Sequence, residues 1–406
     1  MNNTSGMNLR AAWPDFSVYR PPPPAATLIE WIADTGSTTR AWLGDLAGEA
    51  VLGPRHALLN PPQWEVGHLA WFWEKWLLRD GGAAPSGLLG HTDALYDSMA
   101  VAQDTRWDLA LLPWQATWAY LDDVLTLVRK RLSDEVLADE LAYFTQLCVF
   151  HQDMHNEAFA IRRRMLGDLP VSAGLKLLGS LDGDPAIATD VRIPAGCHVL
   201  GARSGAGFVF DNEKWAHAVS HDAFAISSLP VSQGEFAAFV DDDGYRQRRY
   251  WSAPGWAWRA RMNATHPACW RAGPAGWQQR VFDNWQALQT EAPVVHVNAH
   301  EAEAWCAWAG RRLPGEVEWE AAWPHLYARG RVWEWTSSIF APYAGFSADP
   351  YAEYSAPWFD GSYRVLRGGS IATVPRNLWR TWRNFYTPER SDMFCGFRTC
   401  TLVSNP

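Results

Sequence analysis

Apolar residues recur at helical spacing through roughly the first 170 residues and lose that spacing afterwards. In the first part, a period of three to four residues predicts four helices, with Pro, Gly or polar residues at their ends. They run over residues 27–49, 63–79, 113–131 and 133–166. Because the connections between them are short to medium in length, the pattern predicts an antiparallel four-helix bundle.

In the second part, short β-like pieces alternate with Gly and Pro. The strand-like pieces lie at 191–194, 199–201, 208–210 and 223–226, and short helices are predicted at 232–241 and 300–309. The remainder is rich in Trp, Gly and Arg with little regular period. Such a pattern is typical of an α+β domain with long ordered loops.

A chain of 406 residues is too long for one ordinary core. We therefore expect a multidomain protein with an α domain and an α+β domain, divided between residues 170 and 195. An N-terminal arm over 1–25, which ends in four prolines, precedes a helical domain over 26–180 and a second domain over 181–406.

Three histidines are the candidate chemistry of the helical domain. His151 and His155 lie four residues apart in the fourth predicted helix, so both project from one face and could share a metal ion. His68, in the second predicted helix, is a third candidate ligand within an apolar segment. Three neutral imidazoles leave open coordination positions, as catalytic sites do. Glu157 is placed to bond a ligand's second nitrogen or to orient a neighbour.

Spacing alone leaves a second interpretation open. Histidines four residues apart also occur by chance in helix cores, where each is hydrogen-bonded rather than bound to a metal. An imidazole without any partner would be costly to bury in the apolar segment around His68, which favours the metal interpretation.

Composition and charge narrow the class of protein. A hydrophobic content of 48% with 19% charged residues describes a soluble globular chain. The net charge of −9 argues against nucleic acid or an anionic membrane as partner. No apolar run approaches the roughly 20 residues of a membrane span, and the N-terminus lacks a signal-peptide pattern, so we expect a cytoplasmic protein.

The numbers of cysteines and tryptophans add to this description. The six cysteines are scattered without CxxC spacing, which predicts small buried hydrophobes in a reducing compartment. The 26 tryptophans can fill a core, but they can also line a pocket that holds a cation over their ring faces.

The second half carries a succession of motifs, among them Val231–Phe236, Gly310–Pro314, Val332–Thr336, Leu366–Ser370 and Gly396–Arg398. This succession resembles the formylglycine-generating-enzyme/sulfatase-modifying-factor domain, a C-type-lectin-like fold. The first half, with its three histidines, is similar to the metal-binding four-helix domain of the DinB superfamily. Fused in this order, the two resemble the iron-dependent sulfoxide synthases of ergothioneine biosynthesis over nearly the whole chain.

The resemblance implies a non-haem Fe(II) held by His68, His151 and His155. It also implies O2 and hercynine, the trimethylated form of histidine, as substrates, together with a thiol donor that is joined to the imidazole as a sulfoxide. In the second domain, Asn384 matches a residue that contacts hercynine, and Phe385 keeps an aromatic face for the trimethylammonium group.

Further site residues follow from the same resemblance. Tyr343, followed by Phe346 in the same short motif, is the candidate for the catalytic tyrosine that donates a proton. The alternative is that Tyr343 is a packed aromatic of its loop. Arg106, in the loop region after the second helix, is a candidate contact of the donor, although an exposed helix-start arginine is the plainer interpretation.

Two positions depart from the sulfur enzymes. Tyr386 stands where they carry an aspartate that grips γ-glutamylcysteine, and a phenol cannot replace a carboxylate in an ion pair. Met154 stands where they commonly carry Gln. Both changes make the pocket less polar, which favours the related selenoneine synthase branch with a selenosugar donor. Ergothioneine-type synthesis from a thiol such as γ-glutamylcysteine or cysteine is the alternative.

Two other classes remain open. Three-histidine proteins of the DinB type can hold zinc and act as thiol transferases, and a lectin-like module could bind a ligand without catalysis. The sequence is compatible with a monomer or a small homo-oligomer.

Overall fold

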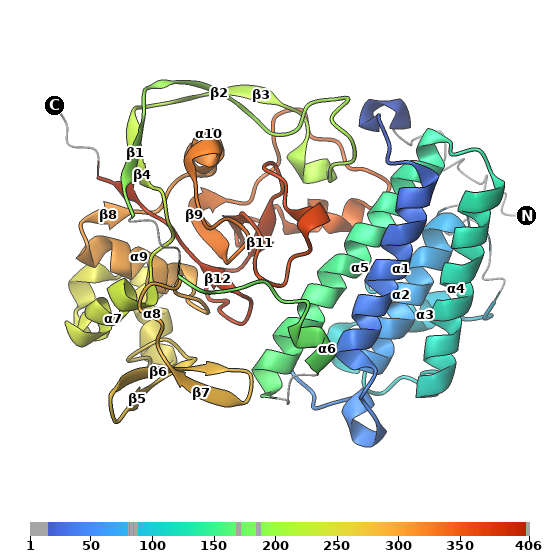
Figure 1. The fold of residues 1–406 in the computed structure, drawn as a ribbon, viewed down its shortest axis with the longest axis horizontal. Helices are drawn as coiled ribbons and strands as arrows, with labels where there is room; N and C mark the ends of the chain where they lie inside the picture. The colour runs from blue at the N-terminus through green and yellow to red at the C-terminus, as the bar shows by residue number, and fades with distance from the viewer. Residues whose placement is uncertain are drawn as a thin grey trace, which may run out of the picture.

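The computed structural model describes residues 15–79, 81, 84, 88–167, 172–183 and 188–402. Helices gather on one side of the molecule and a mixed part lies on the other, with α5 between them (Figure 1). The helices of the first side are α1 (Ala25–Leu43), α2 (Pro62–Leu77), α3 (Thr92–Tyr96), α4 (Trp114–Asp134), α5 (Asp139–Leu166) and α6 (Ser172–Leu175).

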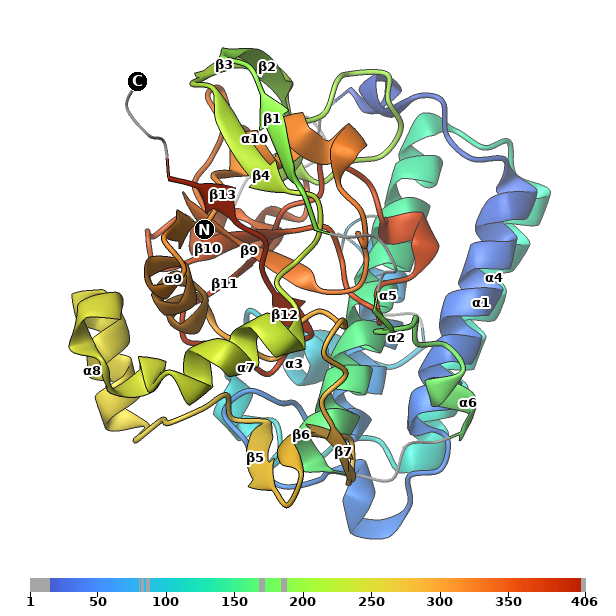
Figure 2. The same ribbon diagram turned by 60° about the vertical axis from the view of Figure 1, so that its left-hand side comes forward.

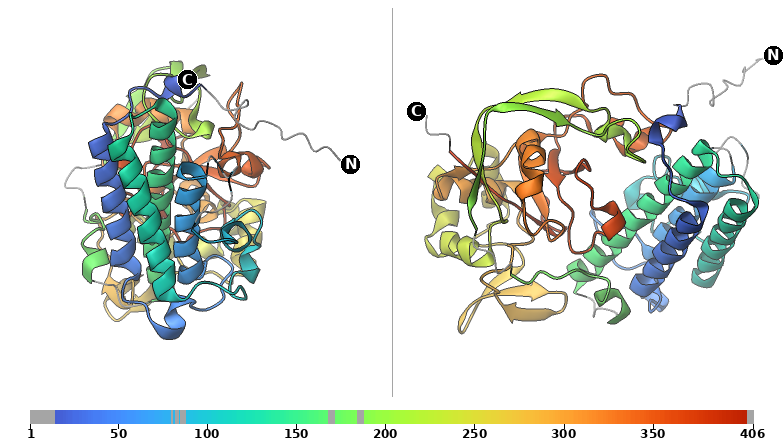
Figure 3. Two further views of the ribbon diagram at one scale, coloured as in Figure 1. Left: turned by 90° about the vertical axis from the view of Figure 1, so that its right-hand side faces the viewer. Right: turned by 45° about the horizontal axis from the view of Figure 1, so that its top comes forward.

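The four long helices pack side by side. Helix α1 contacts α4 and α5, and α2 contacts the same two helices from the other side (Figure 3). The predicted helices are confirmed, with two differences in their bounds. Helix α1 ends at Leu43 rather than at residue 49. Helix α5 begins at Asp139, because Ser133 belongs to α4 and donates its hydroxyl to the carbonyl of Arg129 at 3.0 Å. The likeness of this helical part to the DinB superfamily stays a prediction, as do the domain limits.

The mixed part consists of short strands and four helices. The strands are β1 (Asp190–Ile193), β2 (Gly196–Leu200), β3 (His217–His221), β4 (Phe224–Ser227), β5 (Trp270–Gly273), β6 (Gly276–Val281), β7 (Asn284–Ala287), β8 (Arg311–Arg312), β9 (Trp333–Ile339), β10 (Arg364–Arg367), β11 (Asn384–Tyr386), β12 (Cys395–Gly396) and β13 (Cys400–Thr401). The helices are α7 (Gln233–Asp241), α8 (Ala253–Arg261), α9 (Ala299–Trp308) and α10 (Glu316–Ala322).

Two small sheets form the centre of this part. One has the strand order β1-β4-β13-β8 and the other β11-β10-β9-β12. The two-stranded sheet β2-β3 and the three-stranded sheet β5-β6-β7 lie outside them (Figure 2). Strand β11, at the edge of the second sheet, pairs Tyr386 with Arg364 of β10.

The predicted short helices are confirmed as α7 and α9, and both begin with a capping box, Ser232 with Glu235 and Asn298 with Glu301. The predicted strand at 208–210 is wrong. Phe208, Val209 and Phe210 are all buried in the connection between β2 and β3, so their apolar run reflects burial without strand pairing.

Most cysteines and many tryptophans fill the core. Five cysteines are buried as predicted, whereas Cys197 is exposed. Six tryptophans are among the largest fully buried side chains: Trp64, Trp73, Trp270, Trp319, Trp333 and Trp335. None of the described helices combines the length and apolarity that crossing a bilayer requires.

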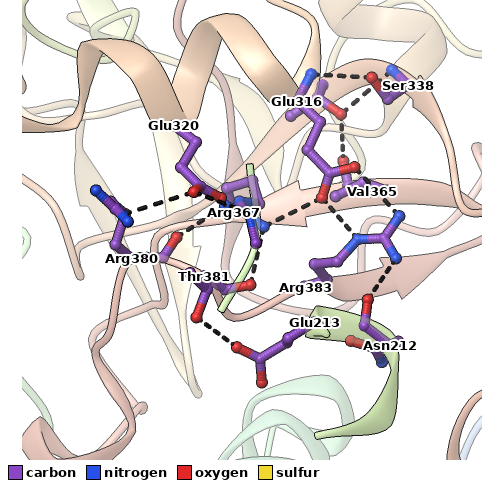
Figure 4. A network of polar contacts seen from close by, with 12 residues as sticks. Asn212, Glu213, Glu316, Glu320, Ser338, Val365, Arg367, Arg380, Thr381 and Arg383 are labelled. Atoms are coloured by element: carbon purple, nitrogen blue, oxygen red, sulfur yellow. Dashed lines mark hydrogen bonds and ion pairs between the residues drawn. The ribbon is translucent and has the colours of Figure 1, made fainter. Parts of the chain in front are cut away.

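A buried charge network ties the second sheet to α10 (Figure 4). Glu316 accepts hydrogen bonds from Arg383 at 2.7 Å and Arg367 at 3.1 Å. Glu320, one turn further on, pairs with Arg367 and lies 3.6 Å from Arg380. Each buried charge has a partner, so this network fixes the segment that leads into β11.

We expect the capping residue Glu301 to make stability depend on pH. It is 2% exposed, and burial raises its pKa from 4.5 to about 7, although it accepts a hydrogen bond from Tyr245 at 2.6 Å. Because the folded pKa lies above the unfolded one, the folded state loses stability as pH rises from about 4.5 to about 7.

Glu301→Gln keeps a capping side chain but cannot ionise. Urea denaturation should therefore show the variant gaining stability relative to the wild type between pH 5 and 8, by up to about 3 kcal/mol. A difference that stays constant over this range would contradict the assignment.

Candidate metal centre

The three predicted histidines lie together at the seam between the two parts. His68 comes from α2, and His151 and His155 come from consecutive turns of α5. One ring nitrogen of each lies within 4.8 Å of those of the other two, and the Nε2 atoms of His68 and His151 are 3.3 Å apart. Metal–imidazole bonds are about 2.1 Å long, so these nitrogens can converge on one ion.

Two of the histidines have their other ring nitrogen occupied. The Nδ1 of His68 donates to the carbonyl of Tyr96 at 2.8 Å, and the Nδ1 of His155 bonds Oε1 of Glu65 at 2.5 Å. Both contacts leave Nε2 free for a ligand bond. Gly67 makes the first contact possible, because a Cβ there would lie 2.2 Å from the Tyr96 ring.

Aromatic rings surround the cluster. Phe72 stacks on His151 at 3.7 Å between centroids, and Trp64 stacks on His68 at 5.0 Å. Burial in these surroundings, with the neighbouring histidines, lowers the pKa values of His68 and His151 well below the ordinary value. Both imidazoles are therefore neutral at pH 7, which is the form that binds a metal.

The hydrogen bonds that the structure describes for Glu157 go to residues other than the three histidines. Its carboxylate accepts hydrogen bonds from Trp333 Nε1 at 2.8 Å, Ser370 at 2.6 Å and Thr373 at 2.8 Å, all in the second part. The carboxylate that holds a histidine is Glu65. A signal for it was present in the sequence, since Glu65 precedes His68 by three residues and shares its helix face.

A second carboxylate of α5 also faces the second part. Asp153, between the two histidines in sequence, forms a two-bonded ion pair with Arg376 at 2.6 and 2.7 Å. The same guanidinium reaches Asp34 of α1 at 2.5 Å. Helix α5 thus carries the histidines on one face and attachment points for the second part on another.

The structure places Tyr343 away from the histidines. Its hydroxyl donates to Glu316 at 3.3 Å, and its ring packs against Arg383 and His217. Tyr343 is thus packed against side chains of the second part, and its catalytic role stays a prediction. Tyr351 instead lies at the cluster, with its ring 6.0 Å from that of His151 and 5.0 Å from Phe72.

The loop that carries Tyr351 is fixed on both sides. Before it, Asp349 accepts hydrogen bonds from Tyr19 at 2.8 Å and Tyr143 at 3.0 Å, and it pairs with Lys214. After it, Ser355 donates to Asp211 at 2.5 Å. Sequence reasoning missed this anchoring, because its partners lie more than a hundred residues away in the chain.

Asn384, Phe385 and Tyr386 form β11 beside the seam. Alternation along a strand directs Asn384 and Tyr386 to one face and Phe385 to the other. Burial raises the pKa of Tyr386 to about 12, with Arg390 opposing and the charge of Glu157 adding to the shift. Phe385 stacks on Phe340 at 3.9 Å.

Three remaining candidates differ in their surroundings. Arg106 is buried rather than exposed, and its guanidinium lies 3.8 Å over Trp64 and bonds Asn60 and the carbonyls of Ser98 and Val101. Phe346 packs against Phe359, away from the histidines. Met154 is half-buried on α5 beside His155, and its contact with a substrate stays a prediction.

Comparison with known proteins places the chain in a family. The sulfatase-modifying factor enzyme 1-like domain family matches residues 180–324 and 327–402. A hercynine oxygenase of Mycolicibacterium smegmatis is 34% identical over 84% of this chain and 91% of its own length. A hercynine oxygenase of Mycobacterium tuberculosis is also 34% identical, with the same coverage.

A more distant relative matches a smaller share of the chain. The formylglycine-generating enzyme of Streptomyces coelicolor is 27% identical over 51% of this chain and 87% of its own length. The identity with the hercynine oxygenases extends over both parts of the structure. The chain is therefore an oxidoreductase that belongs to the hercynine oxygenase family.

Proposed function

We propose that this enzyme uses Fe(II) and O2 to join the imidazole of hercynine to a selenosugar. The observation that carries the proposal is the cluster of three histidines, two of them held neutral, beside a wall contributed by the second part. The relatives named hercynine oxygenases support hercynine as the substrate.

The histidine cluster fits Fe(II). Imidazole nitrogen suits iron, and three neutral ligands leave the ion with its full 2+ charge and open positions. Bound Fe(II) supplies the one-electron chemistry that O2 needs to react. The protein's part is to hold His68 through Tyr96 and His155 through Glu65, and to exclude water with Phe72 and Trp64.

In the proposed reaction, the imidazole C–H between the ring nitrogens and the Se–H of the donor are broken and a C–Se bond forms. O2 accepts four electrons, and one oxygen atom ends on selenium as a selenoxide while the other ends in water. Tyr351 is the proposed proton source, because burial raises its pKa and keeps its hydroxyl protonated next to His151.

A row of aromatic rings supports the binding of a quaternary ammonium. Tyr354 lies 6.1 Å from Tyr351 and 6.2 Å from Phe385, so rings continue from the histidines to β11. Ring faces attract a trimethylammonium group, which cannot form hydrogen bonds. Asn384, with its side chain on the Tyr386 face of β11, is a proposed polar contact of hercynine.

The surroundings of Tyr386 support a donor without carboxylates. Arg390, whose guanidinium lies 5.0 Å from the Tyr386 ring, is already paired with Asp392 at 2.5 and 2.6 Å. Arg106 is held by carbonyls and by Trp64. Arg390 therefore already has a carboxylate partner, whereas a sugar can stack on the phenol ring of Tyr386.

A sulfur donor is the second candidate. The chain matches the two named hercynine oxygenases over 91% of their own length. Their names do not extend to the donor, so the choice between sulfur and selenium depends on the pocket residues at Tyr386 and Met154.

We propose that the helical part is DinB-like. The zinc transferase of that type is the less suitable candidate, because its class lacks the long second domain.

A competition between donors tests the proposed function. The chain is reconstituted with Fe(II) without oxygen and then turned over in air with hercynine and equal concentrations of a 1-selenosugar and γ-glutamylcysteine. Mass spectrometry should find selenium on the imidazole as the main product. A γ-glutamylcysteinyl sulfoxide as the main product would overturn the selenosugar assignment, and no hercynine-derived product from either donor would overturn the function itself. In Tyr386→Asp, the product ratio should shift toward the sulfur donor.

Glu65→Gln should weaken metal binding by about 10- to 100-fold, because the amide orients His155 less strongly than a carboxylate does. Anaerobic titration with Fe(II) or Co(II) measures the affinity directly. Glu74→Gln is the matched control, since Glu74 is buried on the same helix but accepts a hydrogen bond from Tyr120. Equal affinities in the two variants would show that Glu65 does not support the metal.

Tyr351→Phe should lower single-turnover product formation by about 10²-fold or more, the usual effect of losing a proton donor. Tyr343→Phe should retain the rate, because it removes only a hydrogen bond to Glu316 inside the second part. Thermal denaturation of both variants separates a folding defect from a loss of chemistry. A low single-turnover rate in Tyr343→Phe together with a wild-type rate in Tyr351→Phe would make Tyr343 the proton donor instead.

A further inference from the structure

A cavity lies at the seam, on a different face of α5 from the histidines. It encloses about 460 Å³, within the range of small-ligand sites. Phe150 of α5 forms one wall, Arg203 and Phe208 of the β2-β3 connection form another, and Arg376, Trp379 and Arg380 form a third. None of the three histidines lines it, and neither does Tyr351 or Tyr386.

Packed rings separate this cavity from the histidines. Phe150 directly precedes His151, but on a helix its side chain points about 100° away. Its ring packs on Trp379 at 5.3 Å, whereas the ring of His151 packs on Phe72. Phe210 stacks on Tyr354 at 4.2 Å between the two regions. The histidines therefore do not form part of the seam cavity.

The charge of the lining is opposite to that of the whole chain. Three arginines line the cavity and no acidic side chain does, although the chain carries 44 acidic and 35 basic residues. Arg376 is neutralised by Asp153 and Asp34. Arg380 is 42% exposed along its side chain and lies 3.6 Å from Glu320. Within the described part of the chain, Arg203 forms no ion pair.

Arg380 is fixed through its backbone, so its guanidinium can still bind a ligand in the cavity. Figure 4 shows Arg380 reaching toward Glu320, while its neighbour Thr381 donates to Glu213 at 2.7 Å. The carbonyl of Arg380 accepts a hydrogen bond from the buried Arg367 at 2.8 Å. The backbone at Arg380 is thus fixed, and its guanidinium retains donors beyond the single contact with Glu320.

The same cavity offers a flat apolar surface. Trp379 donates its Nε1 hydrogen to Glu213 at 2.7 Å, so only its ring face is available to a ligand. Phe150 and Phe208, 5.1 Å apart, extend this surface. Guanidinium groups beside aromatic faces are complementary to an anion on a flat apolar body.

We propose that the seam cavity binds a small organic anion, with a carboxylate or phosphate group on a flat apolar body. The anionic group pairs with Arg203 and Arg380, and the body packs on Trp379, Phe150 and Phe208. The segment of Arg376 to Arg380 continues into β11 and pairs with Asp153 between the two α5 histidines, so the ligand contacts elements that also build the reaction site.

Calorimetric titration of the full chain with benzoate, phenyl phosphate and inorganic phosphate tests this site. Benzoate or phenyl phosphate should bind, and which of them binds more tightly identifies the anionic group. Neutral benzyl alcohol should bind at least tenfold more weakly. Absence of binding by both aromatic anions, or equal binding of benzyl alcohol, would overturn the proposal.

Variants locate the binding. The double variant Arg203→Gln with Arg380→Gln should lower the affinity for the aromatic anions at least tenfold. Arg246 is an exposed arginine of the same part, so Arg246→Gln should leave that affinity unchanged. Trp379→Leu should lower the affinity for benzoate and phenyl phosphate but leave that for inorganic phosphate unchanged. Unchanged affinity in the double variant would assign the binding elsewhere and refute the seam cavity. These readouts need no turnover, so they are independent of the proposed function.

Discussion

Helix α5 places two buried carboxylates, Asp153 and Glu157, against the second part while its histidines face α2. Asp153 meets the guanidinium of Arg376, and Glu157 receives three uncharged donors. Removing one partner of a buried ion pair typically costs about 3–5 kcal/mol, because the other charge is left in a medium of low polarity. The two parts therefore cannot separate at this helix without exposing unpaired charge, and this attachment also holds the candidate metal centre in place.

Rigidity matters because the site is assembled from both parts. The histidines come from α2 and α5, but Tyr351 comes from a loop of the second part, between the anchors at Asp349 and Ser355. The anchor at Asp349 includes Tyr143, which is two turns before His151 on α5. The helix that carries two candidate ligands thus also positions the loop opposite them, so their relative geometry is set before any substrate arrives.

The parts of this arrangement that sequence could predict are those with local periodicity. The i,i+4 pair His151 and His155 and the apolar segment around His68 required only helix geometry, and the structure brings them together. Glu157 was assigned to a histidine because it is close in sequence, yet its helix face turns it to Trp333. Position on a helix gives direction, but it does not identify what lies in that direction when the partner is 176 residues away.

The loop between β9 and β10 is a place where the local sequence pattern could not predict the structure. Several tyrosines lie in it without any period, and only tertiary contacts distinguish them: Glu316 binds the hydroxyl of Tyr343, while Phe72 packs against Tyr351. Likewise, Phe208 and Phe210 are apolar enough for a strand but are buried by rings from α5 and the 376–382 segment. Aromatic packing between distant segments overrode the local pattern in both places.

The donor that we propose depends on how charge is distributed over the seam. Near Tyr386, Arg390 is matched by Asp392, and the carboxylate of Glu157 is buried nearby, so an added anion would meet a region that is already neutral or negative. On the other side of the seam, Arg203 forms no ion pair within the described part of the chain, and Arg380 shares its only carboxylate partner, Glu320, with Arg367. We therefore expect a donor with carboxylates to favour the proposed anion site over β11, and an uncharged sugar to show no such preference. The same separation of charge that favours a neutral donor at Tyr386 favours an anion in the cavity behind it.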